Sequence, residues 1–200
     1  MKSDWKKFVL AVITFCVLNF APGLVMTALS EMAPQAGRLL VAGKDLADPR
    51  FHQSVILLIQ HDATGTGGVV INRPSQLPLQ ELFAAQPDYA GLAGKLFYGG
   101  PVAPEYLIAL LKTSMSAPGS MKPVIDNLYL SSLDLLLEWL SAQPDEPDYR
   151  VYSGYAGWAP GQLADEIQRG DWLVLPTDAE SVFDSDNTSL WERLQKTRVM

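Results

Sequence analysis

The segment SVILLIQH, residues 54–61, constrains the fold of this chain more than any other stretch of its sequence. It is nearly continuously apolar and rich in valine, isoleucine and leucine, which is typical of a strand buried on both faces of a sheet. The glycine-rich loop HDATGTGG (residues 61–68) follows, and a second apolar segment returns at Val69–Asn72. This order of apolar run, glycine-rich turn and apolar run predicts a β-hairpin.

Shorter apolar segments, bounded by turn residues, predict further strands and helices around this hairpin. We expect short helices at 79–85 and after residues 131, 160 and 189, and a polar, proline-punctuated loop at 112–125. The remaining strands are expected at 38–43, 95–98, 106–111, 127–130, 149–153 and 172–175. The 15 glycines and 14 prolines are too many for a bundle made only of helices. The mixture of hairpins and short helices predicts an α+β fold.

Three of the expected helices carry specific signals at their ends. Ser131 with Asp134 resembles a capping box at a helix start, as does Ser189 with the glutamate three residues later. Pro160 suits the first turn of the helix that follows it, and Gly170 suits the position just past that helix.

The N-terminal segment 8–29 contains no charged residue and follows the basic sequence MKSDWKK. It fits a secretory signal, with an apolar core that ends near Ala21. It also fits a membrane anchor, because its 22 residues can just span about 30 Å of hydrocarbon. A third interpretation is a start codon assigned too early, with Met26 or Met32 as the true first residue. We therefore divide the chain into an apolar extension, residues 1–30, and one domain, residues 31–200.

The charge balance disfavours direct binding to nucleic acid. The formal net charge is −7, and without residues 1–25 the chain keeps 12 basic and 21 acidic residues. A nucleic-acid-binding protein normally carries a basic face that replaces phosphate counterions, and here the basic residues are scattered. The single cysteine, Cys16, lies in the apolar extension, so the domain has neither a disulfide framework nor a thiol nucleophile.

Motifs that would indicate catalysis, metal binding or a cofactor are missing from the sequence. The two histidines, His52 and His61, have no metal-site spacing, and no serine lies in a nucleophile elbow. Residues 65–68 lack the lysine and hydroxyl residue that complete a phosphate-binding loop, so a hairpin turn is the better interpretation. Asp165 and Glu166 are neighbours on a helix and face different directions, unlike a glycosidase pair. We predict no catalytic residue, no metal and no cofactor.

A binding surface is the functional prediction that the residues themselves support. Glycines and large aromatics concentrate in GYAGWAPGQ (154–162), before a helix N-terminus, and loops of this kind are frequent binding surfaces. The competing interpretation is a packed corner in which Tyr155 and Trp158 fill the core. With segments 61–74 and 98–102, the candidate ligand-binding residues are His61, Asn72, Arg73, Tyr98, Gly99, Gly100, Tyr155, Trp158 and Gln162.

Six stretches, in consistent order from Gly37 to Trp172, resemble the AlgH/YqgE family of bacterial proteins. They are GRLLVA (37–42), LADPRF (46–51), SVILLIQHD (54–62), GTGGVVINRP (65–74), FYGGPV (97–102) and GYAGWAPGQLADEI (154–167). The resemblance implies a single α+β domain with a mixed, mostly antiparallel, partly barrel-like sheet surrounded by short helices. One member is named for a role in the transcriptional regulation of alginate production. The resemblance carries over no catalytic residues, and the N-terminal extension lies outside its pattern.

These observations favour a non-catalytic regulatory or adaptor protein that acts on transcription indirectly, through a small molecule or a protein partner. One alternative is a hydrolase or transferase that uses His61, Asp62, Asn72 and Arg73, with Arg73 holding an anionic substrate. A direct DNA-binding regulator is the second alternative. We expect a cytoplasmic protein; the alternative is export or membrane anchoring through residues 8–29, and a membrane association requires that these residues be retained.

Overall fold

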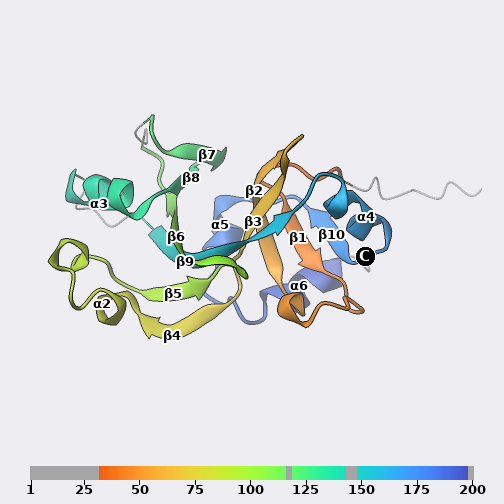
Figure 1. Ribbon diagram of the computed structural model, residues 1–200, viewed down its shortest axis with the longest axis horizontal. Helices are drawn as coiled ribbons and strands as arrows, with labels where there is room; N and C mark the ends of the chain where they lie inside the picture. The colour runs from red at the N-terminus through yellow and green to blue at the C-terminus, as the bar shows by residue number, and fades with distance from the viewer. Residues whose placement is uncertain (1–31, 116–118, 143–147, 198–200) are drawn as a thin grey trace, which may run out of the picture. The chain divides into compact units, whose positions relative to one another are not determined.

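The computed structural model describes residues 32–115, 119–142 and 148–197, and residues 32–200 cluster as one compact unit. The strands form one ten-stranded sheet with a main path β10-β1-β2-β3-β9-β6-β8-β7 (Figure 1). They are β1 (Leu39–Ala42), β2 (Val55–Asp62), β3 (Gly65–Val70), β4 (Pro74–Pro78), β5 (Lys95–Tyr98), β6 (Val102–Lys112), β7 (Lys122–Ile125), β8 (Leu128–Ser131), β9 (Asp148–Trp158) and β10 (Trp172–Leu175). All pairs are antiparallel except β5 with β9. The predicted α+β class and the mixed, mostly antiparallel sheet are confirmed, and the sheet stays open.

Strand β2 is buried on both faces, as its sequence predicts. It pairs with β1 on one side and with β3 on the other. Because side chains alternate along a strand, Val55 and Leu57 pack into one hydrophobic core and Ile56 and Leu58 into a second. All four side chains are fully buried.

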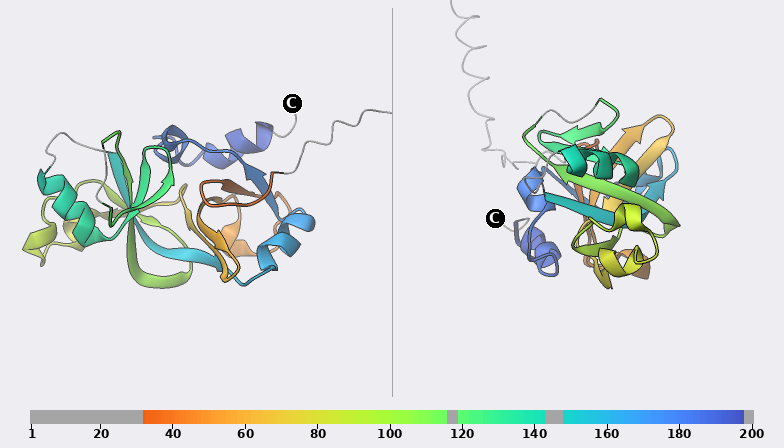
Figure 2. Two further views of the ribbon diagram at one scale, coloured as in Figure 1. Left: turned by 90° about the horizontal axis from the view of Figure 1, so that it is seen from above. Right: turned by 90° about the vertical axis from the view of Figure 1, so that its left-hand side faces the viewer.

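Short helices cover both faces of the sheet, as predicted. They are α2 (Leu79–Leu82), α3 (Leu133–Ala142), α4 (Gln162–Gln168), α5 (Ala179–Val182) and α6 (Leu190–Thr197), with 3₁₀ turns η1 (Pro49–Phe51) and η2 (Pro87–Tyr89). Helices α5 and α6 contribute Val182 and Leu190 to the first core and lie on one side of the strands (Figure 2, left, dark blue). Helix α4 contributes Leu163 to the second core. Helices α2 and α3 close a third core against β6 and β9.

The glycine-rich segments are strands, which corrects two sequence-based expectations. Gly65–Val70 forms β3, so the turn of the hairpin is only residues 63–64. Strand β9 extends to Trp158 and includes the glycine and aromatic residues expected in a loop. The two strands pair through small residues, Gly67 with Gly157 and Gly68 with Ala156. A Cβ on Gly68 would lie 2.6 Å from Ile56 Cγ2, so glycine permits close packing here rather than a turn.

Three local boundaries also differ from the sequence-based expectations. Part of the expected loop 112–125 forms the edge strand β7, where Pro123 is tolerated because an edge strand leaves some N–H positions unpaired. Ser132, rather than Ser131, caps α3: its Oγ accepts from Leu135 N at 3.3 Å. Pro160 precedes the N-cap residue of α4 rather than lying in its first turn.

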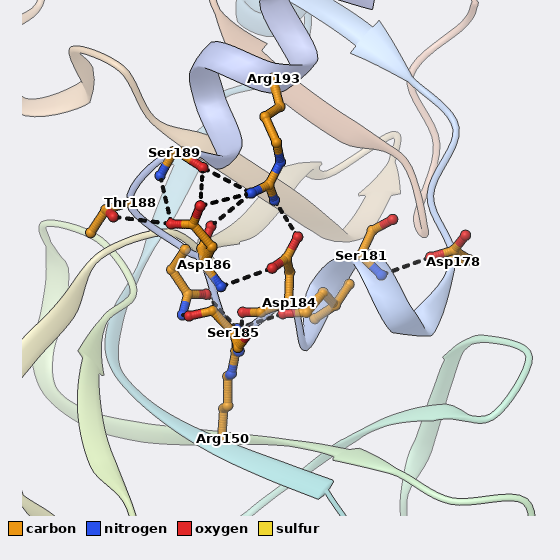
Figure 3. A network of polar contacts seen from close by, with 11 residues as sticks. Arg150, Asp178, Ser181, Asp184, Ser185, Asp186, Thr188, Ser189 and Arg193 are labelled. Carbon is orange, nitrogen blue, oxygen red and sulfur yellow. Dashed lines mark hydrogen bonds and ion pairs between the residues drawn. The ribbon is translucent and has the colours of Figure 1, made fainter.

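The segment that follows β10 is fastened to the sheet by Arg150 of β9. The Arg150 guanidinium donates to the carbonyl oxygens of Val182 (2.6 Å) and Asp184 (2.7 Å) and to Asn187 Oδ1 (2.8 Å). Figure 3 shows Arg150 and Arg193 of α6 reaching this segment from opposite sides. The contacts hold α5 and the start of α6 over the first core.

No helix in the described part of the chain is long and apolar enough to cross a membrane. Residues 8–29, which the sequence allows as a signal or an anchor, lie outside the described residues.

Candidate functional site

A polar cavity of about 260 Å³ lies where the loop before β2 meets the end of β9, α4 and the start of β10. Its walls come from three segments that are distant in sequence: residues 46–51, residues 101–102 and residues within 157–172. We call it the polar cavity. Carboxylate, guanidinium and amide groups line it together with aromatic side chains.

Three aromatic side chains pack together at this cavity. The rings of Trp158 and Trp172 lie edge to face, with centroids 5.8 Å apart, and Phe51 packs against both. Both tryptophans are more than nine-tenths buried. Because their faces are covered, the indoles act as a rigid wall and not as open stacking surfaces.

Glu166 holds this aromatic wall in place. Its Oε2 accepts from the indole Nε1 of Trp158 at 2.7 Å and from that of Trp172 at 2.8 Å. Its Oε1 accepts from Gln162 Nε2 at 2.9 Å, one helical turn earlier on α4. The side chain of Gln162 also accepts from Ala159 N, which ties the end of β9 to the helix. In the sequence Glu166 stands out only as the neighbour of Asp165; its spacing of four residues from Gln162 is the signal that could have pointed to this role.

Two arginine–aspartate pairs stand at the rim of the cavity. Arg50 Nη2 lies 2.7 Å from Asp48 Oδ2, and Arg169 Nη2 lies 2.8 Å from Asp171 Oδ2. The hydrogen bond from Arg50 lowers the pKa of Asp48 below its ordinary value. The rim therefore presents both positive and negative groups to a polar ligand at neutral pH.

Of the nine candidate ligand-binding residues, only Trp158 and Gln162 line the polar cavity. Arg73 does not line the cavity but holds the loop that does: Arg73 Nη1 and Nη2 donate to the carbonyl oxygens of Arg50 (2.5 Å) and His52 (2.7 Å). Burial lowers the pKa of Arg73. Asn72 is buried and joins two backbone segments: Oδ1 accepts from Val55 N at 2.9 Å and Nδ2 donates to Gln53 O at 2.8 Å.

The other candidates lie elsewhere. His61, at the exposed end of β2, pairs through Nδ1 with Thr66 Oγ1 at 2.7 Å. Gly99 and Gly100 sit against the backbone of β9. The backbone N–H of Tyr98 donates to Arg73 O at 2.9 Å. Tyr155 lines a separate apolar groove.

The four groups of the hydrolase or transferase alternative have separate bonding partners. Arg73 and Asn72 both donate to backbone carbonyl oxygens, and His61 forms a hydrogen bond with Thr66. Asp62 instead accepts from the backbone and hydroxyl of Thr64, at 2.8 and 2.5 Å. Among the described residues, no group of three or more histidine, cysteine, aspartate or glutamate side chains could hold a metal ion.

The fold and the polar cavity define an α+β protein built on one open, mostly antiparallel sheet. Residues 39–198 match the AlgH-like family, and the chain belongs to this family. It is 35% identical to a UPF0301 protein of Streptomyces coelicolor over 174 residues, which cover 84% of this chain and 89% of that protein. It is 38% identical to a UPF0301 protein of Mycobacterium tuberculosis over 165 residues, covering 78% and 79% of the two chains.

Two solved structures share the fold. The crystal structure of a Corynebacterium diphtheriae protein matches with a TM-score of 0.73 and 27% identity, covering 85% of this chain and 90% of that one. The solution structure of the AlgH protein from Pseudomonas aeruginosa matches with a TM-score of 0.64 and 29% identity, covering 86% and 92%. Three of the stretches that resemble the family, residues 46–51, 97–102 and 154–167, contribute to the polar cavity in this chain.

Proposed function

We propose that this protein is a non-catalytic regulator that binds a small polar molecule, or a polar group of a protein partner, at the polar cavity, and so affects transcription indirectly. The observation that carries the proposal is the convergence of three separated family-like stretches on one cavity. A set of residues brought together from 46–51, 97–102 and 154–167 is the usual basis of a ligand site, because only the folded chain assembles it.

The groups at the cavity suit recognition better than catalysis. Glu166 accepts hydrogen bonds from two indoles and an amide, which leaves it committed to holding the wall. Arg50 and Arg169 are exposed at the rim, and each already donates from Nε and Nη2 to its aspartate, so Nη1 is the donor that each can offer to a ligand. A charged N–H donor pairs best with an anionic acceptor, so an anionic group is the feature that the ligand should carry. The chain's net charge of −7 argues against DNA as that anion.

A complementation experiment tests the proposal. In the native organism, the gene is deleted and replaced by wild type, by the double variant Arg50→Gln/Arg169→Gln, or by the matched control Lys95→Gln/Lys196→Gln. Both variants remove two positive charges from exposed positions, but neither Lys95 nor Lys196 lines the cavity. Circular dichroism of the purified variants establishes that they fold.

The expected result is that deletion changes a defined set of transcripts, and that wild type and the control restore them while the cavity variant does not. Full restoration by the cavity variant would reject the cavity as the functional site. The same promoters are then tested with purified protein in a gel-shift assay at about 0.15 M salt. Specific binding there would replace indirect regulation with direct DNA binding.

A further inference from the structure

A second hollow, separate from the polar cavity, lies beside β2, β3, β6, β8 and the first turn of α3. Its volume is about 540 Å³, within the range of about 300–1,000 Å³ that is usual for ligand pockets. We call it the apolar groove. Five aliphatic side chains line it: Ile59, Leu107, Ile108, Leu130 and Leu135.

Aromatic side chains continue this apolar surface into solvent. Tyr106, which lines the groove, leaves 68% of its surface exposed, an unusual exposure for a large side chain in a strand. It belongs to a stretch of β6 where the register with β9 shifts between Val102 and Leu107. Tyr155 of β9 lines the same groove. An apolar surface of this kind is stabilised when an apolar ligand removes it from water.

The charge in the groove is positive, in contrast to the chain as a whole. Lys122 of β7 lines it and donates from Nζ to the Ile59 carbonyl oxygen at 3.2 Å, which holds the ammonium against β2. Lys122 pairs with Leu130 in the sheet, and Ser131 and Ser132, which follow Leu130 in the chain, also line the groove. Among the described residues that line the groove, none is acidic. A ligand that fits must therefore combine a long apolar part with an anionic group.

We propose that the apolar groove binds a free long-chain fatty acid. The alkyl chain lies along the aliphatic side chains, and the carboxylate pairs with the Lys122 ammonium and accepts from the Ser132 hydroxyl, because the Ser131 hydroxyl already donates to Ser132 O. Two features of the site support this choice. An unbranched chain suits a lining made of several aliphatic side chains, and a single lysine is a point charge that matches one carboxylate.

Chain length and head group are tested separately by isothermal titration calorimetry on the full-length chain. Decanoate, dodecanoate and tetradecanoate are titrated below their micelle concentrations, with dodecan-1-ol as the uncharged analogue. Each buried methylene should tighten binding about fourfold, so each step of two methylenes should tighten it about fifteenfold. Affinity that does not depend on chain length would overturn the proposal.

Two variants locate the ligand. Lys122→Met keeps an apolar stem and removes the charge; it should weaken dodecanoate binding at least fivefold and leave dodecan-1-ol unchanged, whereas Lys95→Met should change neither. Gly67→Leu places a side chain in the groove, and a Cβ there would meet only Gln60 Cβ, at 3.9 Å, so the fold should tolerate it. It should weaken both ligands at least tenfold.

The opposite results are equally informative. Equal loss of both ligands in Lys122→Met would remove the assigned carboxylate contact. Unchanged binding in a folded Gly67→Leu variant would place the ligand elsewhere in the chain, including the apolar residues 8–29. An absence of measurable binding for the whole series would reject the fatty acid as the occupant and leave a protein segment as the alternative.

Discussion

The indole nitrogens of Trp158 and Trp172 donate to one and the same carboxylate oxygen, Oε2 of Glu166. The two rings lie nearly perpendicular, at 83°, on β9 and at the start of β10. Both indoles are buried, so their N–H groups need an acceptor within the protein. The glutamate thus joins β9, α4 and β10 at the wall of the polar cavity.

Replacing Glu166 tests how strongly this contact stabilises the fold. Glu166→Ala removes the acceptor of two buried N–H groups, and we expect a loss of about 1–3 kcal/mol in the free energy of unfolding. Glu166→Gln keeps one acceptor oxygen and should lose less. Urea unfolding followed by tryptophan fluorescence measures both. Glu138→Ala, at an exposed position on α3, is the control. If Glu166→Ala lowers the free energy of unfolding no more than Glu138→Ala does, the role assigned to Glu166 is wrong.

Replacing Arg73 even by lysine should destabilise the loop before β2. Its two terminal nitrogens donate to the carbonyl oxygens of Arg50 and His52, and a lysine has no planar fork to reproduce both bonds. We expect Arg73→Lys to cost about 1–2 kcal/mol. Hydrogen exchange at the Phe51 and Ser54 amides, which bond within this loop, should become faster.

Arg169→Lys is the matched control for that experiment, because Arg169 is exposed and its side chain donates to the nearby Asp171. Its amide exchange at Phe51 and Ser54 should equal that of the wild type. Unchanged exchange in Arg73→Lys as well would show that Arg73 does not hold the loop.

Gly99 should not accept a side chain. A Cβ at this position would lie 2.3 Å from the Gly154 carbonyl oxygen, a backbone atom that cannot rotate away. We expect Gly99→Ala to destabilise the protein by about 3 kcal/mol, the upper end for overpacking. Gly91→Ala is the control, because a Cβ there meets nothing within 4 Å. Equal melting temperatures for the two variants would contradict the close approach of Gly99 to Gly154 of β9.

Acid should loosen the segment after β10. Hydrogen bonds from Ser181 N to Asp178, and from the Ser189 side chain to Asp186, lower the pKa of both carboxyls below the ordinary 3.8. The unfolded chain therefore binds protons more readily, so this stability is complete above about pH 4 and is lost as the pH falls through the lower, folded-state pKa values. Urea unfolding at pH 7, 5, 4 and 3 should show the decline.

The double variant Asp178→Asn/Asp186→Asn isolates that effect. It removes both carboxyls from the titration, so its stability should fall less steeply between pH 4 and 3 than that of the wild type. Parallel declines in the two proteins would assign the acid sensitivity to other groups.

Elements with local signals can be predicted from the sequence alone. The apolar run in β2 predicts a strand buried on both faces, and the bounds expected for β5 and β10 match those of the structure. Gly170 follows α4 with a positive φ of 82°, as its place at a helix end predicts. These features depend on neighbouring residues and on burial, which composition and periodicity report directly.

The roles of the glycines and the polar groups, in contrast, follow from contacts between segments that are distant in sequence. Gly67 and Gly157 indicate loops or turns when read along the chain, yet they pair with each other across the strands β3 and β9. Arg73 and Asn72 look like free polar groups in sequence, but they bond to backbone about 20 residues away. Glu166 accepts hydrogen bonds from Trp158 and Trp172, whose indoles lie beside it because the folded chain places β9 and β10 next to α4. Such contacts depend on distances in space, and no local pattern of residues encodes them.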